Sequence, residues 1–211
     1  MNYGQFQDRV LQLVDQYSVA GVRVAATYNN QQDYLHKIPG LLNDALREIC
    51  TTRRKLPAVL TLSAETGERL GETLRFRMPD NFFQFRTGDS FVSAEDGTPL
   101  HTNLYSLLGQ RFLLVPAGEL DEGRSYTVVY YRYPETLPEK PPRSAELDGP
   151  PEAQEAAVFY AAAFLAVRDD PFLYAALYNK YEDKLEKLSP GLSAEVVPPS
   201  TSGGNWGVYE C

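Results

Sequence analysis

The stretch AVFYAAAFLAVRDDPFLYAALYNKYEDKLEKL, from Ala157 to Leu188, contains two consecutive helices and determines how the rest of the chain has to pack. Its first half is rich in alanine, whose small side chain lets neighbouring helices approach closely. Asp170 is placed to cap the second helix, and Pro171 suits its first position. The second helix carries one apolar stripe, made of Leu173, Leu177, Tyr181, Leu185 and Leu188. We therefore expect both helices to pack within a larger helical bundle.

Two more helices are predicted near the start of the chain. The first has an apolar stripe at helical spacing, formed by Phe6, Val10, Val14 and Tyr17. The second runs from about Asp33 to Lys55, and its apolar side consists of Leu35, Ile38, Leu42, Ala45, Leu46 and Ile49. Pro39 and Gly40 lie inside this pattern, so we expect a kink or a fresh helix start there. The basic residues that close its last turn, where cations complement the helix dipole, are Arg53, Arg54 and Lys55.

The pattern changes between Leu56 and Pro134 to short alternating segments. Six of them are typical of strands: AVLTLSA, ETLRFRM, FFQFRTG, SFVSA, RFLLVPA and SYTVVYYRYP. Gly-, Pro- and Asp-rich turns separate them. Six strands without intervening helices indicate an antiparallel sandwich or a small barrel. The proline-rich PETLPEKPPRSAELDGPP that follows is expected to be extended and weakly structured.

The order of these elements predicts an α+β protein with one interrupted domain. Neither helical part has enough apolar surface to fold alone, so residues 1–56 and 150–190 are expected to form one helical bundle. Residues 57–149 are expected to be an inserted antiparallel β domain with its proline-rich return linker. Residues 191–211 are predicted to be an extended C-terminal arm.

Composition narrows the classes of function. The chain has 211 residues and a net charge of −8, which argues against a general nucleic-acid binder, because such proteins need a basic surface. The same charge fits a passage through which DNA slides without sticking. No apolar segment approaches the length of a membrane span, so we expect no membrane partner. Cys50 and Cys211 form no disulfide framework, which favours a reduced cytosolic setting.

No pattern of residues indicates catalysis. The chain has two histidines, and it lacks a phosphate-binding loop and the familiar hydrolase motifs. Asp89, Asp96 and His101 could be imagined around a divalent ion, but loop aspartates mostly stabilise turns and this spacing matches no calcium loop. We therefore expect no enzyme, no metal site and no cofactor.

The helical segments resemble the head–tail connector adaptor (head-completion) proteins of tailed bacteriophages. DYLHKIPGLLNDALREICTTRRKLPAV is similar to their early helix, and the Ala157–Leu188 stretch is similar to their closing helix pair, with its DDP break and NKYE sequence. The resemblance covers about half of the chain, and the β part looks like the inserted domain of larger adaptors.

This resemblance implies a structural virion protein that is assembled in the host cytoplasm. Such adaptors form a ring, typically of twelve copies, beneath the portal protein of the filled head. The ring extends the DNA channel and docks the tail or a second connector protein, and DNA passes through without specific binding. Their C-terminal arms commonly reach the portal or a neighbouring subunit.

The single tryptophan, Trp206, lies in a tail that looks unable to pack alone. Tryptophan is enriched among interface hot spots, so we expect a portal- or subunit-binding segment formed by Val196, Val197, Trp206, Val208 and Tyr209. Folding of this tail back onto its own bundle is the alternative. For Arg53, Arg54 and Lys55, the alternatives are a solvated helix end and a contact to a partner or to DNA in the channel.

Two aromatic groups allow further interpretations. Tyr160, Tyr174, Tyr178 and Tyr181 are expected to pack within the bundle, although their number also allows a flat aromatic face for a partner subunit. In the β part, Phe82, Phe83, Tyr105 and Tyr130 would form a sugar platform if the protein were instead a carbohydrate- or ligand-binding module. Core packing explains these four more simply.

Overall fold

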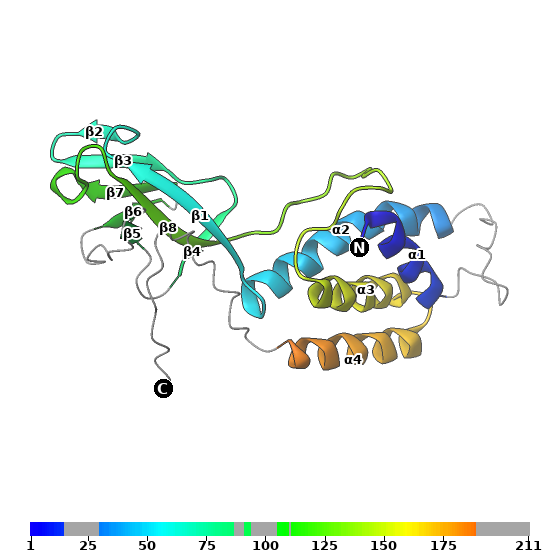
Figure 1. Cartoon of the computed structure of the whole chain (residues 1–211). Helices are drawn as coiled ribbons and strands as arrows, with labels where there is room; N and C mark the ends of the chain where they lie inside the picture. Colours follow the sequence, from blue (N-terminus) through cyan, green and yellow to red (C-terminus); the bar gives the residue numbers. More distant parts are fainter. Residues whose placement is uncertain (15–29, 87–90, 94–104, 110, 189–211) are drawn as a thin grey trace, which may run out of the picture. The chain divides into compact units, whose positions relative to one another are not determined.

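A computed structural model describes residues 1–14, 30–86, 91–93, 105–109 and 111–188 (Figure 1). Within them the chain forms four α-helices and two antiparallel sheets, which confirms the α+β class. The chain divides into two compact units. The helical unit combines Met1–Leu56 with the described residues from Tyr133 onward, and the β unit is Pro57–Arg132.

The helical unit is built around one central helix. Its helices are α1 (Tyr3–Leu13), α2 (Asn30–Thr52), α3 (Pro151–Ala166) and α4 (Pro171–Lys187). α3 contacts each of the other three, and Figure 1 shows it between α2 and α4. All seven of its alanines are buried. Because a helix that is apolar all round is stable only when it is covered on every side, the alanine-rich sequence of α3 determines its central place.

The corner between α3 and α4 forms as the sequence predicts. Asp170 is the N-cap of α4, and its Oδ1 accepts hydrogen bonds from the backbone N–H groups of Phe172 (3.0 Å) and Leu173 (2.9 Å). Such a cap typically contributes about 1 kcal/mol. The predicted stripe of α4 faces the core, with Leu177, Tyr181, Leu185 and Leu188 all buried.

The expectation of a break at Pro39 needs a correction in one respect. α2 continues through this proline as a single helix, without a fresh start. Its apolar side is buried on both sides of the proline, at Ile38 before it and at Leu42 and Leu46 after it. Because both halves pack into the same core, their burial offsets the penalty of about 3 kcal/mol for an interior proline.

The β unit consists of two four-stranded sheets that share a core. One sheet contains β1 (Leu56–Ser63), β8 (Ser125–Arg132), β4 (Phe82–Phe85) and β5 (Phe91–Ser93); the other has the order β2 (Glu68–Leu70), β3 (Thr73–Arg77), β7 (Phe112–Pro116), β6 (Ser106–Leu108). Buried side chains from both sheets, such as Leu62, Phe76, Val115 and Val128, form one cluster. Two packed sheets with a common apolar layer make a sandwich.

All six predicted strands are present, and the sequence missed two short ones. β2 and β6 have three residues each and lie at the edges of their sheet. Their residues are exposed, so neither has the alternating pattern that marks a half-buried strand. β2 forms because Gly71 takes a positive φ of 65°, which closes the turn that pairs Leu70 with Thr73.

The return segment, residues 133–149, differs from our expectation. It was predicted to be a weakly structured linker of the β domain, but its contacts group it with the helical unit. The side-chain amide of Asn43 on α2 donates to Leu137 O (2.9 Å) and accepts from Leu137 N–H (3.0 Å). Leu147 is buried in the helical core, and the buried amide of Gln154 donates to Leu147 O (2.9 Å). Polar side chains of the helices thus hold a segment that has little regular structure.

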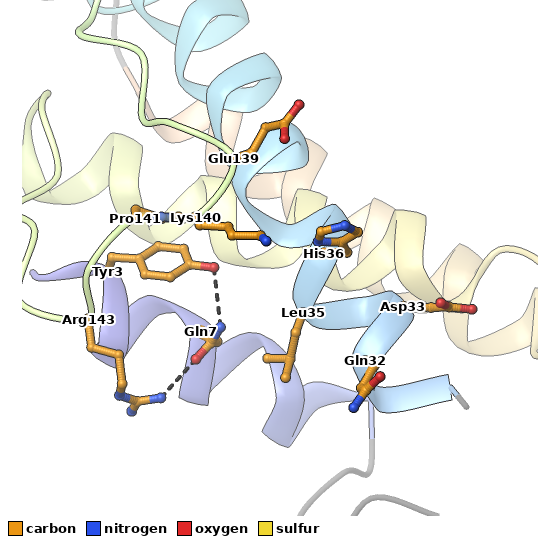
Figure 2. A pocket seen from close by; sticks show the side chains of 10 residues that line it. All are labelled: Tyr3, Gln7, Gln32, Asp33, Leu35, His36, Glu139, Lys140, Pro141 and Arg143. Atoms are coloured by element: carbon orange, nitrogen blue, oxygen red, sulfur yellow. Dashed lines mark hydrogen bonds between the residues drawn. The ribbon is translucent and has the colours of Figure 1, made fainter. Parts of the chain in front are cut away.

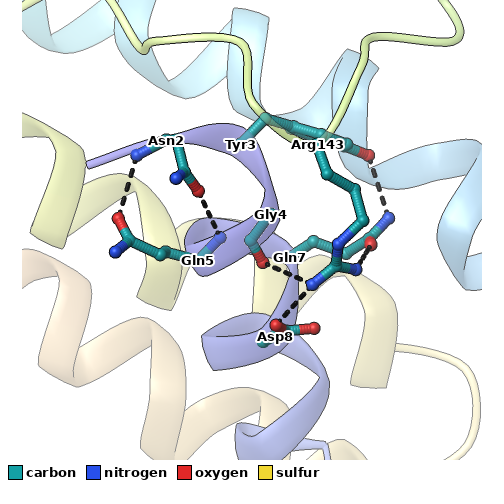
Figure 3. A network of polar contacts seen from close by, with 7 residues as sticks. All are labelled: Asn2, Tyr3, Gly4, Gln5, Gln7, Asp8 and Arg143. Atoms are coloured by element: carbon teal, nitrogen blue, oxygen red, sulfur yellow. Dashed lines mark hydrogen bonds and ion pairs between the residues drawn. The ribbon is translucent and has the colours of Figure 1, made fainter.

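The return segment also caps α1 (Figure 3). The first N–H groups of a helix have no partner within it. Here Asn2 and Gln5 form a capping box, while Tyr3 N–H donates to Ala145 O (2.7 Å) and Gly4 N–H donates to Arg143 O (2.8 Å). The Arg143 guanidinium in turn donates to Gln7 (2.8 Å) and pairs with Asp8 (2.6 Å). The start of α1 is therefore completed by residues about 140 positions later.

This close approach predicts an unusual effect at Gly4. A Cβ atom there would lie 3.0 Å from the Arg143 carbonyl oxygen, which is held by the Gly4 N–H. We expect Gly4→Ala to lower the free energy of unfolding by about 1–3 kcal/mol, as overpacking does, although alanine is the better helix former. Urea unfolding followed by circular dichroism measures the change.

Gly40 in α2 is the matched control, because a Cβ there would meet nothing within 4 Å. Gly40→Ala is expected to stabilise the protein by about 1 kcal/mol. If Gly4→Ala and Gly40→Ala stabilised the protein equally, the return segment would have no steric contact with α1 at Gly4.

Candidate interaction surface

The predicted binding residues of the tail lie outside the described residues. These are Val196, Val197, Trp206, Val208 and Tyr209. The predicted basic contact is described: Arg53 and Arg54 follow directly after α2, and both backbone N–H groups donate to Ile49 O at 2.9 Å. The Arg53 side chain is exposed, and those of Arg54 and Lys55 are partly exposed. The two readings of this group, a solvated helix end and a partner contact, are both compatible with that exposure.

An aromatic cluster fills the space between α3 and α4. It contains Tyr160 and Phe164 of α3 and Tyr174, Tyr178 and Tyr181 of α4. Neighbouring ring centroids lie 4.5–6.2 Å apart, mostly tilted or edge to face. Only Tyr181 is fully buried; the other four rings are partly exposed. The packing interpretation is therefore confirmed, and the aromatic face for a partner subunit stays a prediction that the partial exposure of four rings allows.

Carboxylates surround the exposed side of this cluster. Burial and then the charges of Glu48 and Asp44 on α2 raise the pKa of Tyr160. Burial and then the charge of Glu182 raise the pKa of Tyr178. All three carboxylates are exposed. We call the surface formed by Tyr160, Tyr174, Tyr178, Asp44, Glu48 and Glu182 the acidic tyrosine face.

One polar atom beneath this face lacks a well-formed hydrogen bond. The hydroxyl of Tyr181, a residue with no exposed surface, makes no hydrogen bond of acceptable geometry within the described part of the chain. Burial raises the pKa of this phenol, followed by the charge of Glu48 and the contact of the hydroxyl with its carboxylate. The hydroxyl therefore faces the Glu48 carboxylate without a hydrogen bond of good geometry.

The corner between α3 and α4 exposes apolar side chains. Phe172 is 90% exposed and Val167 is 42% exposed. Beside them the Tyr34 hydroxyl of α2 donates to Asp169 Oδ2 (2.7 Å). Burial, together with the hydrogen bond to this carboxylate, raises the pKa of Tyr34 to about 12. The hydrogen bond therefore ties the start of α2 to the corner while the phenol is neutral.

The hydrogen bond between Tyr34 and Asp169 predicts a pH dependence of the free energy of unfolding. Since the folded pKa of Tyr34 lies above its usual value of 10, its contribution is complete below pH 10 and is lost as the pH rises through 12. We expect Tyr34→Phe to lower the free energy of unfolding by up to about 1 kcal/mol at pH 8. The gap between the two proteins should shrink at pH 11.5 in urea titrations, and a gap independent of pH would contradict this role.

A cavity of about 430 Å³ lies in the helical unit between α1, α2 and the return segment (Figure 2). Tyr3 and Gln7 line one side, and Lys140 extends from the return segment toward α2, which carries His36 (Figure 2). Gln7 donates to the Tyr3 hydroxyl (3.2 Å), whose pKa burial raises. His36 has no nucleophile hydrogen-bonded to it among the described residues, so this cavity shows no base–nucleophile pair.

Two of the four aromatic residues considered as a sugar platform lie in the core of the β unit. Phe82 and Tyr130 are buried, and their ring centroids lie 5.7 Å apart. Tyr105 packs edge to face against Phe85 (5.3 Å) beside this core. Two of the four residues that the carbohydrate-binding alternative requires are therefore buried and unable to contact a sugar. Asp89, Asp96 and His101 lie outside the described residues, and no group of three metal-ligating side chains occurs within them.

Sequence reasoning identified the tyrosines of the acidic tyrosine face but missed its carboxylates. Asp44 and Glu48 are four residues apart on α2, a spacing that places them on one side of the helix. Exposed acids at this spacing are common, so nothing in the sequence tied them to tyrosines more than 100 positions later.

Comparison with known proteins adds one finding. A family model described as SU10 adaptor protein matches residues 1–199, which includes the helical unit, the β unit and the beginning of the tail. A search of curated proteins finds no match. No described helix is long and apolar enough to cross a membrane.

Proposed function

The chain belongs to the SU10 adaptor protein family, whose members are phage structural adaptors, and from this premise we propose that it forms a ring beneath the portal. In this proposal the ring, of about twelve copies by resemblance to connector adaptors, extends the DNA channel and docks the tail or a second connector protein. The family match over residues 1–199 is the observation that carries the proposal. It covers the β unit as well, so that unit is part of what the family shares.

The charge of the chain supports a role around passing DNA. With a net charge of −8, the protein as a whole repels phosphates, and DNA can slide past it without being retained. The protein acts by assembly and not by catalysis, and it becomes a virion component after assembly in the host cytoplasm.

The tail is the proposed contact to the portal. Val196 and Val197 lie inside the family match, whereas Trp206, Val208 and Tyr209 lie beyond its end at residue 199. Trp206 is flanked by glycines, which let the backbone adapt to a partner surface. We therefore assign the tryptophan segment a contact that is particular to this chain, and Val196 and Val197 a contact that its relatives share.

Binding to purified portal rings tests the proposal. The full chain is expected to co-sediment with portal rings and to give one discrete ring of adaptor copies by mass photometry or cryo-electron microscopy. Failure of the folded full chain to bind portal rings, or its absence from virions, would overturn the proposed function.

Two truncations test the assignment of the tail. Removal of residues 200–211 or Trp206→Ala should weaken portal binding at least tenfold, as loss of a hot-spot residue does, and leave the melting temperature unchanged. Removal of residues 191–211 should weaken it further. If the shorter truncation lowers the melting temperature by several degrees, the tail instead folds back onto its own bundle.

A further inference from the structure

The acidic tyrosine face has the features of a site for a positively charged group. Asp44, Glu48 and Glu182 form no ion pair within the described residues. They surround aromatic rings that are partly exposed, and the buried Tyr181 hydroxyl beneath them faces Glu48 without a hydrogen bond of good geometry. Exposed carboxylates without a cationic partner, next to aromatic rings, favour a positively charged group on this face.

The chemistry of the face favours an arginine. A guanidinium stacks on an aromatic ring and at the same time donates two hydrogen bonds to a carboxylate. The protein already shows the first of these contacts at Arg47, whose guanidinium carbon lies 4.5 Å from the Tyr133 ring centroid. Rings of Tyr174 and Tyr178, stacked with centroids 5.6 Å apart, offer the same kind of surface.

The sequence supplies a basic group that matches this face. Arg53, Arg54 and Lys55 form the only run of adjacent arginines and lysines in the chain. Several other arginines have acidic partners: Arg75 pairs with Glu68, Arg77 with Asp80, Arg124 with Asp121 and Arg143 with Asp8. The tail is unsuited to the face, because no lysine or arginine follows Lys187.

Helix geometry directs these two groups to different contacts. Asp44 and Arg53 are nine positions apart, which is about two and a half turns, so they lie on opposite sides of α2 and roughly 13 Å apart along its axis. The backbone hydrogen bond from Arg53 N–H to Ile49 O keeps the helical geometry to this point. Asp44 and Arg53 on opposite sides of one helix suit a head-to-tail contact, and such contacts close into a ring where the rotation between copies allows it.

We propose that Arg53 and Arg54 of one copy bind the acidic tyrosine face of the next copy in the ring. The inference rests on the proposed function, because it requires that copies assemble side by side. The molecule that covers the face is then a second copy of this chain. Its arginine guanidinium packs on the tyrosine rings and pairs with the carboxylates of Asp44, Glu48 and Glu182.

A charge swap tests this contact. Glu48→Arg and Arg53→Glu are each expected to lower the yield of assembled rings on portal at least tenfold. The double variant Glu48→Arg/Arg53→Glu should restore it to within about threefold of the wild type, because every contact then has the reversed pair. Mass photometry gives the yield, and circular dichroism with thermal unfolding shows that each variant is folded.

Two exposed charges of α4 provide matched controls. Asp183→Arg and Lys180→Glu make the same changes of charge outside the two groups and should leave the yield unchanged. Single reversals that assemble like the wild type, or a double variant that does not recover, would overturn the inference and leave the proposed ring intact. A wild-type protein that forms no ring on portal would overturn the proposed function, and the inference with it.

Discussion

The burial of α3 on every side is the constraint on which the rest of the helical unit depends. Its seven alanines have little apolar surface each, so they contribute only if other helices approach closely from all directions. α1 and α2 precede the β unit in the chain and α4 follows it. The helices that surround α3 thus come from both sides of the β unit in the sequence, and the chain leaves the bundle after Leu56 and comes back to it at Tyr133. Helices on both sides of the insertion therefore share one core.

The return to the bundle is fixed by polar contacts more than by apolar ones. The side-chain amide of Asn43 both donates to and accepts from the backbone of Leu137. The side-chain amide of Gln154 donates to the carbonyl of Leu147. Backbone carbonyls of the return segment in turn accept hydrogen bonds from the N–H groups of Tyr3 and Gly4 at the start of α1. Backbone groups that lack a partner within their own element are thus paired between the two elements. This reciprocity explains how a proline-rich segment without strands or helices belongs to the bundle.

The acidic tyrosine face, which we propose as an assembly contact, lies on the outside of the same bundle. The aromatic rings between α3 and α4 continue from the buried Tyr181 to the partly exposed Tyr174 and Tyr178. A packing cluster therefore becomes a surface where it meets Asp44 and Glu48 of α2. Family membership says that the chain is a phage structural adaptor, and we propose that such surfaces and the tail select its partners.

Local chemistry determined what could be read from the sequence alone. Asp170 and Pro171 specify the α3–α4 corner, alternation specifies six strands, and alanine content specifies close packing of α3 against other helices. Tertiary structure decided the features that depend on residues far apart. β2 and β6 exist because longer strands pair with them, α2 continues through Pro39 because both of its halves share one core, and Arg143 meets α1 only after the bundle closes. The acidic tyrosine face belongs to this second group, because its carboxylates and rings come from three helices, and no local pattern records that they meet.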